Sequence, residues 1–299
     1  MSKYDILYNQ QVNEIIENGI WDKDQIIRPK WYDGTPAYTK SIISKQLIFD
    51  GSEVPILTSK RVSWKTAIHE ILWFYVKRTS DCAYLDENKV KIWKEWTRED
   101  NTIGRSYGYQ LGKNFISKVV MGNAKYHTPE GKLSSTIIPR AEYTNQVQKL
   151  IDGIKNDPAS RRHIISLWNI DDAWDMALQP CVWHNQFLIK EKKLNLIVGI
   201  RSNDIALGQP FNVFQYYVLQ RMISQITGYE IGQLIFNIND NHIYERHIDV
   251  LKKQILQVPF ESPTLYLNPN IKNFDDFKIR DFILDNYQHH PSLDFEVAI

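Results

Sequence analysis

A cysteine is the residue of this sequence best suited to covalent chemistry. Cys181 lies in the aromatic stretch LQPCVWHNQF, and Cys82 is the only other cysteine. A lone cysteine is commonly a small buried hydrophobe, but a thiolate stabilised by positive charge is a nucleophile. If residues 181–189 form a strand, Cys181 shares one face with Trp183 and Asn185, and His184 points to the other face. This alternation disfavours a Cys–His thiol hydrolase and leaves arginines as the source of stabilisation.

Arginines occur at the ends of two apolar stretches. Arg161 and Arg162 open one of them, and Arg201 with Ser202 closes another. A guanidinium group donates two parallel hydrogen bonds to phosphate oxygens, so these positions suit a phosphate at the mouth of a sheet. Ordinary surface ion pairs are the alternative for each arginine taken alone.

Two polar residues lie in or beside apolar helices. Glu70 is in the middle of the helix expected over 64–77, where a carboxylate must be paired, hydrogen-bonded or raised in pKa. A raised pKa is what general acid–base chemistry needs. Asn212 precedes another apolar helix, where it is either an N-cap or an amide able to read a pyrimidine edge.

Further candidates are aromatic or lie near the end of a strand. His242 and Tyr244 share a face if the chain is extended there, and they could bind a sugar hydroxyl. Trp93 and Trp96 are either core residues or a stacking wall for a flat ligand.

The elements that hold these residues alternate without a strict βαβ repeat, so we expect an α+β fold with a mixed sheet. No linker or repeat divides the chain, which predicts one domain over 1–299. The segment 113–141 has weak periodicity, two glycines and two prolines, and is expected to be a loop insertion. The patterns predict helices over 4–18, 64–77, 143–157, 213–228 and 242–255, a strand–turn–strand unit over 44–57, and strands over 161–168, 181–189, 193–202 and 233–240.

Composition narrows the class of protein. Lys and Arg total 36 against 35 Asp and Glu, so the net charge of +1 favours neither DNA binding nor an anionic membrane. The longest apolar run, ILWFYV, is too short to span a bilayer. Two cysteines without CxxC spacing predict no metal site and a reducing cytoplasmic setting.

The set of motifs resembles thymidylate synthase over essentially the whole chain. The stretches IHEILWF, IWKEW, IGRSYGYQ, SRRHI, QPC, RSND, LGQPFN and NHIY occur in the order and approximate spacing of that family. The chain is most similar to the bacterial and bacteriophage branch that carries PCV. The resemblance implies reductive methylation of dUMP to dTMP, with 5,10-methylenetetrahydrofolate as cosubstrate and dihydrofolate as the second product.

The resemblance also implies a role for each site residue. Cys181 would add to C6 of the uracil, making C5 able to attack the one-carbon unit. The chain would form a homodimer in which Arg161 and Arg162 reach into the partner's site. The other implied roles are phosphate binding by Arg28, Arg201 and Ser202, uracil recognition by Asn212, deoxyribose binding by His242 and Tyr244, proton movement by Glu70 and Tyr107, and folate contacts by Lys60, Trp93, Asp204 and the terminal Val297, Ala298 and Ile299.

The chain departs from the family pattern at four positions. Pro29 follows Arg28 where a hydroxyl residue is common, Lys94 replaces an acid, Val182 replaces a frequent His, and Asn239 replaces a Gly. The first of these bears on the phosphate contact and the second on the wall near the folate.

Two further functions compete with the synthase. A dUMP hydroxymethylase would use the same fold and cysteine but capture the intermediate with water. Asn212 favours uracil in both enzymes, the VAI tail and Trp93 favour the synthase, and Lys94 favours the rival. A non-catalytic nucleotide- or RNA-binding relative is disfavoured by retention of Cys181 and Glu70 and by the near-zero net charge.

Overall fold

A mixed six-stranded sheet forms the centre of the fold. The structure is a computed structural model that describes residues 2–299. The sheet consists of β1 Ile20–Trp21, β2 Thr39–Phe49, β8 Glu230–Tyr244, β7 Lys193–Asp204, β6 Val182–Lys190 and β5 Ile164–Ser166, in that spatial order. Only β7 and β8 run parallel, and the other neighbours are antiparallel. The α+β class with a mixed sheet is therefore confirmed.

Helices and short turns complete the body. The α-helices are α1 Lys3–Asn18, α2 Trp64–Leu72, α3 Ala83–Glu87, α4 Gly108–Gly112, α5 Gln146–Asn156, α6 Gly208–Thr227 and α7 Ile248–Gln254. A π-helical turn, η1 Trp73–Lys77, continues α2, and the 3-10 turns are η2 Lys94–Trp96, η3 Ala173–Asp175, η4 Glu245–His247, η5 Phe274–Asp276 and η6 Ile279–Asp281. A small hairpin joins β9 Thr264–Leu267 to β10 Phe282–Asp285. Within residues 2–299, no helix is long and apolar enough to cross a membrane.

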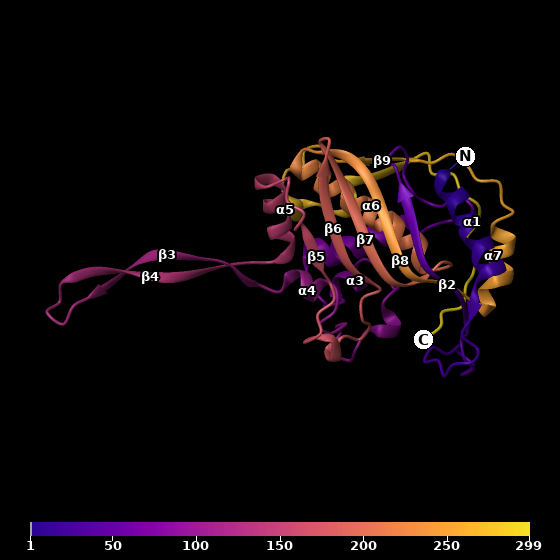
Figure 1. The fold of residues 1–299 in the computed structure, drawn as a ribbon, viewed down its shortest axis with the longest axis horizontal. Helices are drawn as coiled ribbons and strands as arrows, with labels where there is room; N and C mark the ends of the chain where they lie inside the picture. Colours follow the sequence, from indigo (N-terminus) through magenta and orange to yellow (C-terminus); the bar gives the residue numbers. More distant parts are fainter. Residues whose placement is uncertain (1) are drawn as a thin grey trace.

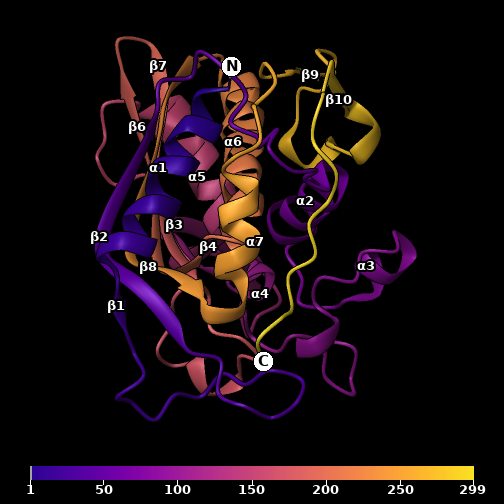
Figure 2. The same ribbon diagram turned by 90° about the vertical axis from the view of Figure 1, so that its right-hand side faces the viewer.

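The main helices pack on one face of the sheet (Figure 2). Alternate residues of β7, namely Leu194, Leu196 and Val198, are buried beneath them. Each such side chain contributes about 2 kcal/mol through burial. The buried helix α6 ends at Gly228, which has φ +79° and donates its N–H to the carbonyl of Ser224.

The described residues, 2–299, place no helix on the opposite face of the sheet (Figure 2). A row of cross-strand neighbours runs over it from β2 to β5: Ile48, Ile235, Ile197, Gln186 and Ile164. The two ends of this row are well exposed, Ile48 at 47% and Ile164 at 51%. We call these five residues the open-face row.

The expectation of a loop over 113–141 is wrong in its structure. Strands β3 Phe115–His127 and β4 Leu133–Thr144 form an antiparallel hairpin that projects from the body (Figure 1). Neither strand pairs with the main sheet. Most of its side chains are exposed, so no buried face imposes the alternation by which a strand is recognised in sequence.

Three smaller expectations also need correction. Residues 54–57 are buried but belong to no strand, because an apolar run alone does not distinguish a strand from buried coil. The helix expected over 242–255 begins at Ile248, since β8 continues through Tyr244. Helix α6 begins at Gly208, so Asn212 lies inside it and is not its N-cap.

Candidate active site

Cys181 lies immediately before β6, where the pairing with β7 is irregular. The register shifts between Val182 and His184, so strict alternation fails at this point. Trp183 and His184 both lie over Gly199, on the open face, whereas Val182 is buried. The expected grouping of Trp183 with Asn185, which is buried, is thus wrong, and the contacts of Cys181 are with residues other than His184.

Two neighbours define the environment of the Cys181 thiol. Its backbone N–H donates to the hydroxyl oxygen of Tyr107 at 2.9 Å. The Arg201 Nη2 atom lies 3.9 Å from Sγ, and the Arg201 N–H donates to the Cys181 carbonyl. Burial raises the thiol pKa, and the opposing charges of Arg201 and Arg28 do not offset it. Both arginines nevertheless act in the expected direction, because their charges lower the thiol pKa.

Tyr107 is buried in an aromatic cluster next to Cys181. Its ring stacks on Phe74 with centroids 4.4 Å apart and meets the edge of Trp93 at 5.5 Å. Burial holds the pKa of its hydroxyl well above the usual value. A neutral hydroxyl is therefore present beside the cysteine at physiological pH.

The carboxylate of Glu70, a residue of α2, accepts hydrogen bonds from two side chains. Trp93 Nε1 donates to Oε1 at 2.5 Å, and Gln215 Nε2 donates to Oε2. Burial nevertheless raises the pKa of Glu70 to about 7. Gln215 was missed in the sequence, where the only signal was an amide within the otherwise apolar part of α6.

The arginines expected at the phosphate reach the same region from different segments. Arg201 donates from Nε and Nη2 to the carbonyls of Pro180 and Gln179 at 3.0 and 2.8 Å. Ser202 pairs with Asp240 across β7 and β8. Arg28 lies in the exposed segment before β2, and its charge acts on the Cys181 thiol.

Arg161 and Arg162 are not part of this cluster within one chain. Both are exposed where β5 begins at the edge of the sheet. Among residues 2–299 neither forms an ion pair. Arg162 borders a cavity of about 560 Å³ that is also lined by residues of α4 and α5.

The end of β8 holds the two residues expected at the sugar. His242 Nδ1 lies 2.6 Å from Asp240 Oδ1, and its ring meets Tyr244 edge-on with centroids 5.2 Å apart. In the parallel register His242 is opposite Asp204. The charges of Asp204, Cys181 and Arg28 all act on Tyr244, whose pKa burial raises.

Asp204 and Asn212 border Gly208 at the start of α6. Asp204 Oδ1 accepts the N–H groups of Ala206 and Leu207 at 2.8 and 3.3 Å. Over residues 2–299 the Oδ2 atom of Asp204 and the amide of Asn212 make no hydrogen bond to protein. Both groups are thus available to a ligand.

The residues expected at the folate lie near the carboxyl-terminal tail. Lys60 is buried, donates to the Ala206 carbonyl and lies 4.5 Å from the Phe295 ring centroid. Burial lowers its pKa to about 8. Lys60 is thus beneath the tail and not on an open surface, while Trp93 borders Glu70 and Tyr107 and Ala298 is half-buried.

The tail itself is bonded to the segment before β2. The N–H and carbonyl of Ile299 pair with those of Lys30, at 2.9 and 2.8 Å. Arg246 Nη1 donates to Glu296 at 2.9 Å and Nη2 donates to Asp33 at 2.6 Å. No group of three or more His, Cys, Asp or Glu within the described part of the chain is placed to hold a metal ion.

Comparisons with known proteins match this architecture over its whole length. A family model described as thymidylate synthase matches residues 6–299. Thymidylate synthase 1 of Bacillus subtilis is 51% identical over 300 residues, and the thymidylate synthase of Bacillus phage phi3T is 50% identical, with all of each chain covered. The solved structure of thermostable thymidylate synthase A from Bacillus subtilis is 50% identical, with a TM-score of 0.88 and complete coverage of both chains.

Proposed function

The chain belongs to the thymidylate synthase family, and we propose that Cys181 is the nucleophile of its reaction. The enzyme reductively methylates dUMP to dTMP, with 5,10-methylenetetrahydrofolate as cosubstrate and dihydrofolate as product. The relatives give the dUMP hydroxymethylase alternative no support, because those reported above are named thymidylate synthases. The observation that carries the proposal is the contact of Cys181 with both Arg201 and Tyr107.

Cys181 acts by covalent catalysis. Its thiol loses a proton, and the sulfur forms a bond to C6 of the uracil, so that C5 becomes a nucleophile. Arg201, 3.9 Å from Sγ, stabilises the thiolate against the burial that raises the thiol pKa. Elimination of Cys181 at the end of the reaction breaks the S–C6 bond and restores the ring.

Glu70 and Tyr107 serve proton movement near Cys181. A carboxyl with a pKa of about 7 exchanges its proton readily at neutral pH. Trp93 fixes the orientation of this carboxyl through its Nε1–H, and the neutral Tyr107 hydroxyl lies at the Cys181 backbone.

The remaining residues bind dUMP. The unpaired amide of Asn212 both donates and accepts, as the edge of a uracil ring requires. Arg28, Arg201 and Ser202 take the phosphate, and His242 with Tyr244 takes the deoxyribose hydroxyl.

The residues present also fit the folate. When bound, 5,10-methylenetetrahydrofolate supplies the one-carbon unit and the hydride. Asp204 offers Oδ2 to a ring N–H, because only Oδ1 is occupied by the chain. Trp93 provides an aromatic wall, Lys60 lies beside the tail, and Ala298 within the tail helps to exclude water.

The active enzyme is a homodimer of single-domain chains. The helix-free sheet face, with its exposed open-face row, supports sheet-to-sheet packing of two copies. Arg161 and Arg162, exposed and unpaired in the described chain, are then free to enter the partner's site. Both cysteines are free thiols, which suits a reducing cytoplasm.

Product analysis with two matched cysteine variants tests the nucleophile. The nucleotide formed from dUMP is weighed by mass spectrometry while dihydrofolate absorbance is followed in the same tube. Cys181→Ser is expected to lower kcat on the order of a thousandfold or more, whereas Cys82→Ser retains activity. Full activity of Cys181→Ser would overturn the proposal, and a hydroxymethyl product would contradict synthase chemistry.

Mixed dimers test the crossing arginines. Cys181→Ser and the double variant Arg161→Ala, Arg162→Ala are each inactive as homodimers under this proposal. A heterodimer of the two contains one site with its own Cys181 and intact arginines from the partner, so activity returns. If the arginines act within their own chain, no complete site forms and the mixture stays inactive.

A further inference from the structure

Two segments near the active site are joined along their length. Residues 98–113 carry Tyr107, and residues 169–181 end in Cys181. Their backbones form a bridge between Gly104 and Met176. Three hydrogen bonds extend this contact: Arg105 N–H to the Asp175 carbonyl at 3.0 Å, Ala177 N–H to the Ile103 carbonyl at 3.1 Å, and Ser106 Oγ to the Leu178 carbonyl at 2.7 Å.

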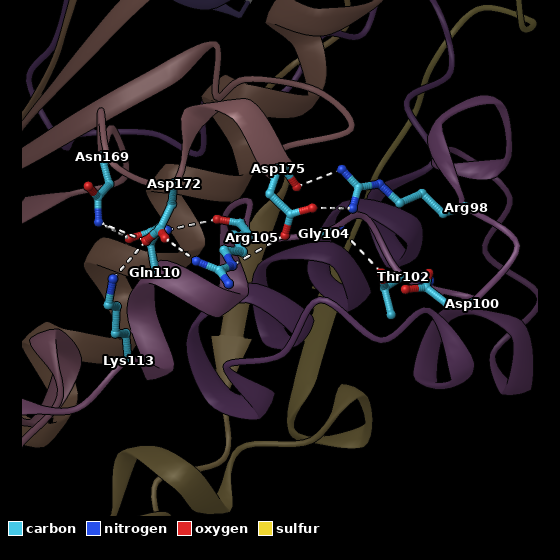
Figure 3. Close-up of polar contacts among 10 residues, drawn as sticks. All are labelled: Arg98, Asp100, Thr102, Gly104, Arg105, Gln110, Lys113, Asn169, Asp172 and Asp175. Carbon is cyan, nitrogen blue, oxygen red and sulfur yellow. Dashed lines mark hydrogen bonds and ion pairs between the residues drawn. The ribbon is translucent and has the colours of Figure 1, made fainter.

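Asp172 is the polar centre of this junction (Figure 3). Its side chain is almost fully buried, with 3% of the surface exposed. Four donors surround the carboxylate: Gln110 Nε2 at 2.9 Å, Asn169 Nδ2 at 2.9 Å, Lys113 Nζ at 2.7 Å and Arg105 Nη1 at 2.9 Å. Hydrogen bonds from Gln110, Lys113 and Arg105 hold its pKa well below the usual range.

The neighbouring Tyr107 has a strained backbone. Its φ of +32° and ψ of −95° lie outside the regions that a tyrosine ordinarily adopts. A conformation of this kind costs about 1–3 kcal/mol and persists only where the surroundings fix it. Asp172 holds Arg105 on one side of this residue and Gln110 on the other, so it fixes both flanks of the strained position.

We propose that Asp172 is a positioning residue for the reaction, which ties the segment of Tyr107 to the segment of Cys181 and so sets the Tyr107 hydroxyl against the Cys181 backbone. The proposal rests on Cys181 being the nucleophile. Asp172 itself touches neither the Cys181 thiol nor Glu70, and it acts through Tyr107. A buried ionic cluster is weak evidence for stability, whereas its place around one strained residue indicates positioning.

A double-mutant cycle with Tyr107→Phe tests this coupling. We expect Asp172→Asn alone to lower kcat by about ten- to a hundredfold. A misplacement of about 1 Å at the reacting groups has an effect of this order. The KM for dUMP is expected to change much less. In the Tyr107→Phe background the same substitution should lower kcat by less than about threefold. Equal losses in both backgrounds would overturn the proposal.

Thiol reactivity gives a readout that a loss of stability alone does not change. Iodoacetamide alkylation of Cys181 is followed by mass spectrometry, with Cys82 as the internal reference. Asp172→Asn should alter the rate at Cys181 relative to Cys82. The matched control is Asp281→Asn, which removes another buried carboxylate, bonded to Asn268 and to the Lys278 N–H. The control should lower the melting temperature without changing that ratio, and an equal change in both variants would contradict positioning.

A milder variant covers the case in which Asp172→Asn does not fold. Asn169→Ala removes one donor to Asp172. It is expected to lower kcat less than Asp172→Asn does, and again less in the Tyr107→Phe background than in the wild-type enzyme. Additive effects in an enzyme that still depends on Cys181 would overturn only the role of Asp172. Retained activity of Cys181→Ser would overturn the proposed function instead.

Discussion

Glu70 has two hydrogen-bond donors and still keeps its proton near neutral pH. Trp93 and Gln215 both favour the ionised carboxylate, but burial outweighs them and raises the pKa to about 7. The sequence left a structural hydrogen bond and a raised pKa as alternatives. The structure shows both at once, because the donors orient the group without supplying enough positive charge to ionise it.

The raised pKa of Glu70 predicts how stability depends on pH. Between pH 4.5, the usual pKa of a glutamate, and about 7, the native state holds a proton that the unfolded state has released. The free energy of unfolding therefore falls as pH rises through this range, by about 3 kcal/mol in total. Glu70→Gln should remove this slope, as measured by urea unfolding at pH 5 to 8 (~1-unit steps). An unchanged slope in the variant would contradict the assignment.

Candidate site residues could be predicted from their residue types, but their hydrogen-bond partners could not. Cys181, Glu70 and Asn212 were identified from their types and local settings. Gln215 and Asp172 were missed, because their partners are distant in the sequence. Gln215 lies 145 residues from Glu70, and Asp172 lies 59 residues from Lys113 and 67 from Arg105. A single sequence contains no record of such pairings before the chain folds.

At the scale of elements, Arg246 connects the carboxyl-terminal tail to the segment before β2. Its guanidinium joins Glu296 of the tail to Asp33 of the segment before β2, and it lies 4.8 Å from the Trp31 ring centroid. Each exposed ion pair is weak alone, but one planar group here orients several partners together.

Arg246→Ala is expected to open the tail more often. The KM for the folate should rise several-fold and kcat should fall, because an open tail admits water and holds the cosubstrate loosely. Steady-state kinetics with both substrates measures this effect. Lys252→Ala is the matched control. Lys252 is exposed, and its ion pair with Asp249 is long, with 3.8 Å between Nζ and Oδ1. Identical kinetics in the two variants would refute the role of Arg246.

Elements with a buried face were predictable, and those without one were not. The strands β6, β7 and β8 and the helix α6 follow from apolar patterns that the core requires. The sequence predicts a loop in place of the hairpin β3–β4, because neither face of the hairpin is buried and its strands have no apolar alternation. The irregular start of β6 was missed because a bulge of one residue leaves no mark in the sequence.

The hairpin should also be the least protected strand pair. Its backbone hydrogen bonds are exposed to solvent, whereas those of β7 and β8 lie in the middle of the sheet. We expect amides of 115–144 to exchange with deuterium at least about a hundredfold faster than those of β7. Mass spectrometry of peptic fragments measures both, and equal protection would show that the hairpin is covered in solution.

At the scale of the whole molecule, the proposed homodimer would use the sheet face on which the described residues place no helix. Ile197 lies in the middle of the open-face row, between Ile235 and Gln186. Two copies packed on this face would bury it twice, once in each chain.

Ile197→Glu is therefore expected to separate the dimer. A carboxylate without a partner in the interface should weaken association by about a hundredfold or more and reduce dTMP formation with it. Sedimentation equilibrium combined with activity over a range of protein concentrations measures both. Ile283→Glu, at an exposed position of β10, is the matched control and should remain dimeric and active. A dimeric, active Ile197→Glu would show that the copies meet elsewhere.

The projecting hairpin has one more consequence, for the behaviour of the protein at high concentration. A ribbon of two strands has two outer edges whose backbone N–H and C=O groups are free to recruit strands from other molecules. Lys118, Lys125 and Lys132 place positive charges along it, and Pro139 removes a donor from the middle of β4. The charges and the proline thus disfavour the pairing of strands from other molecules along the exposed edges of this hairpin.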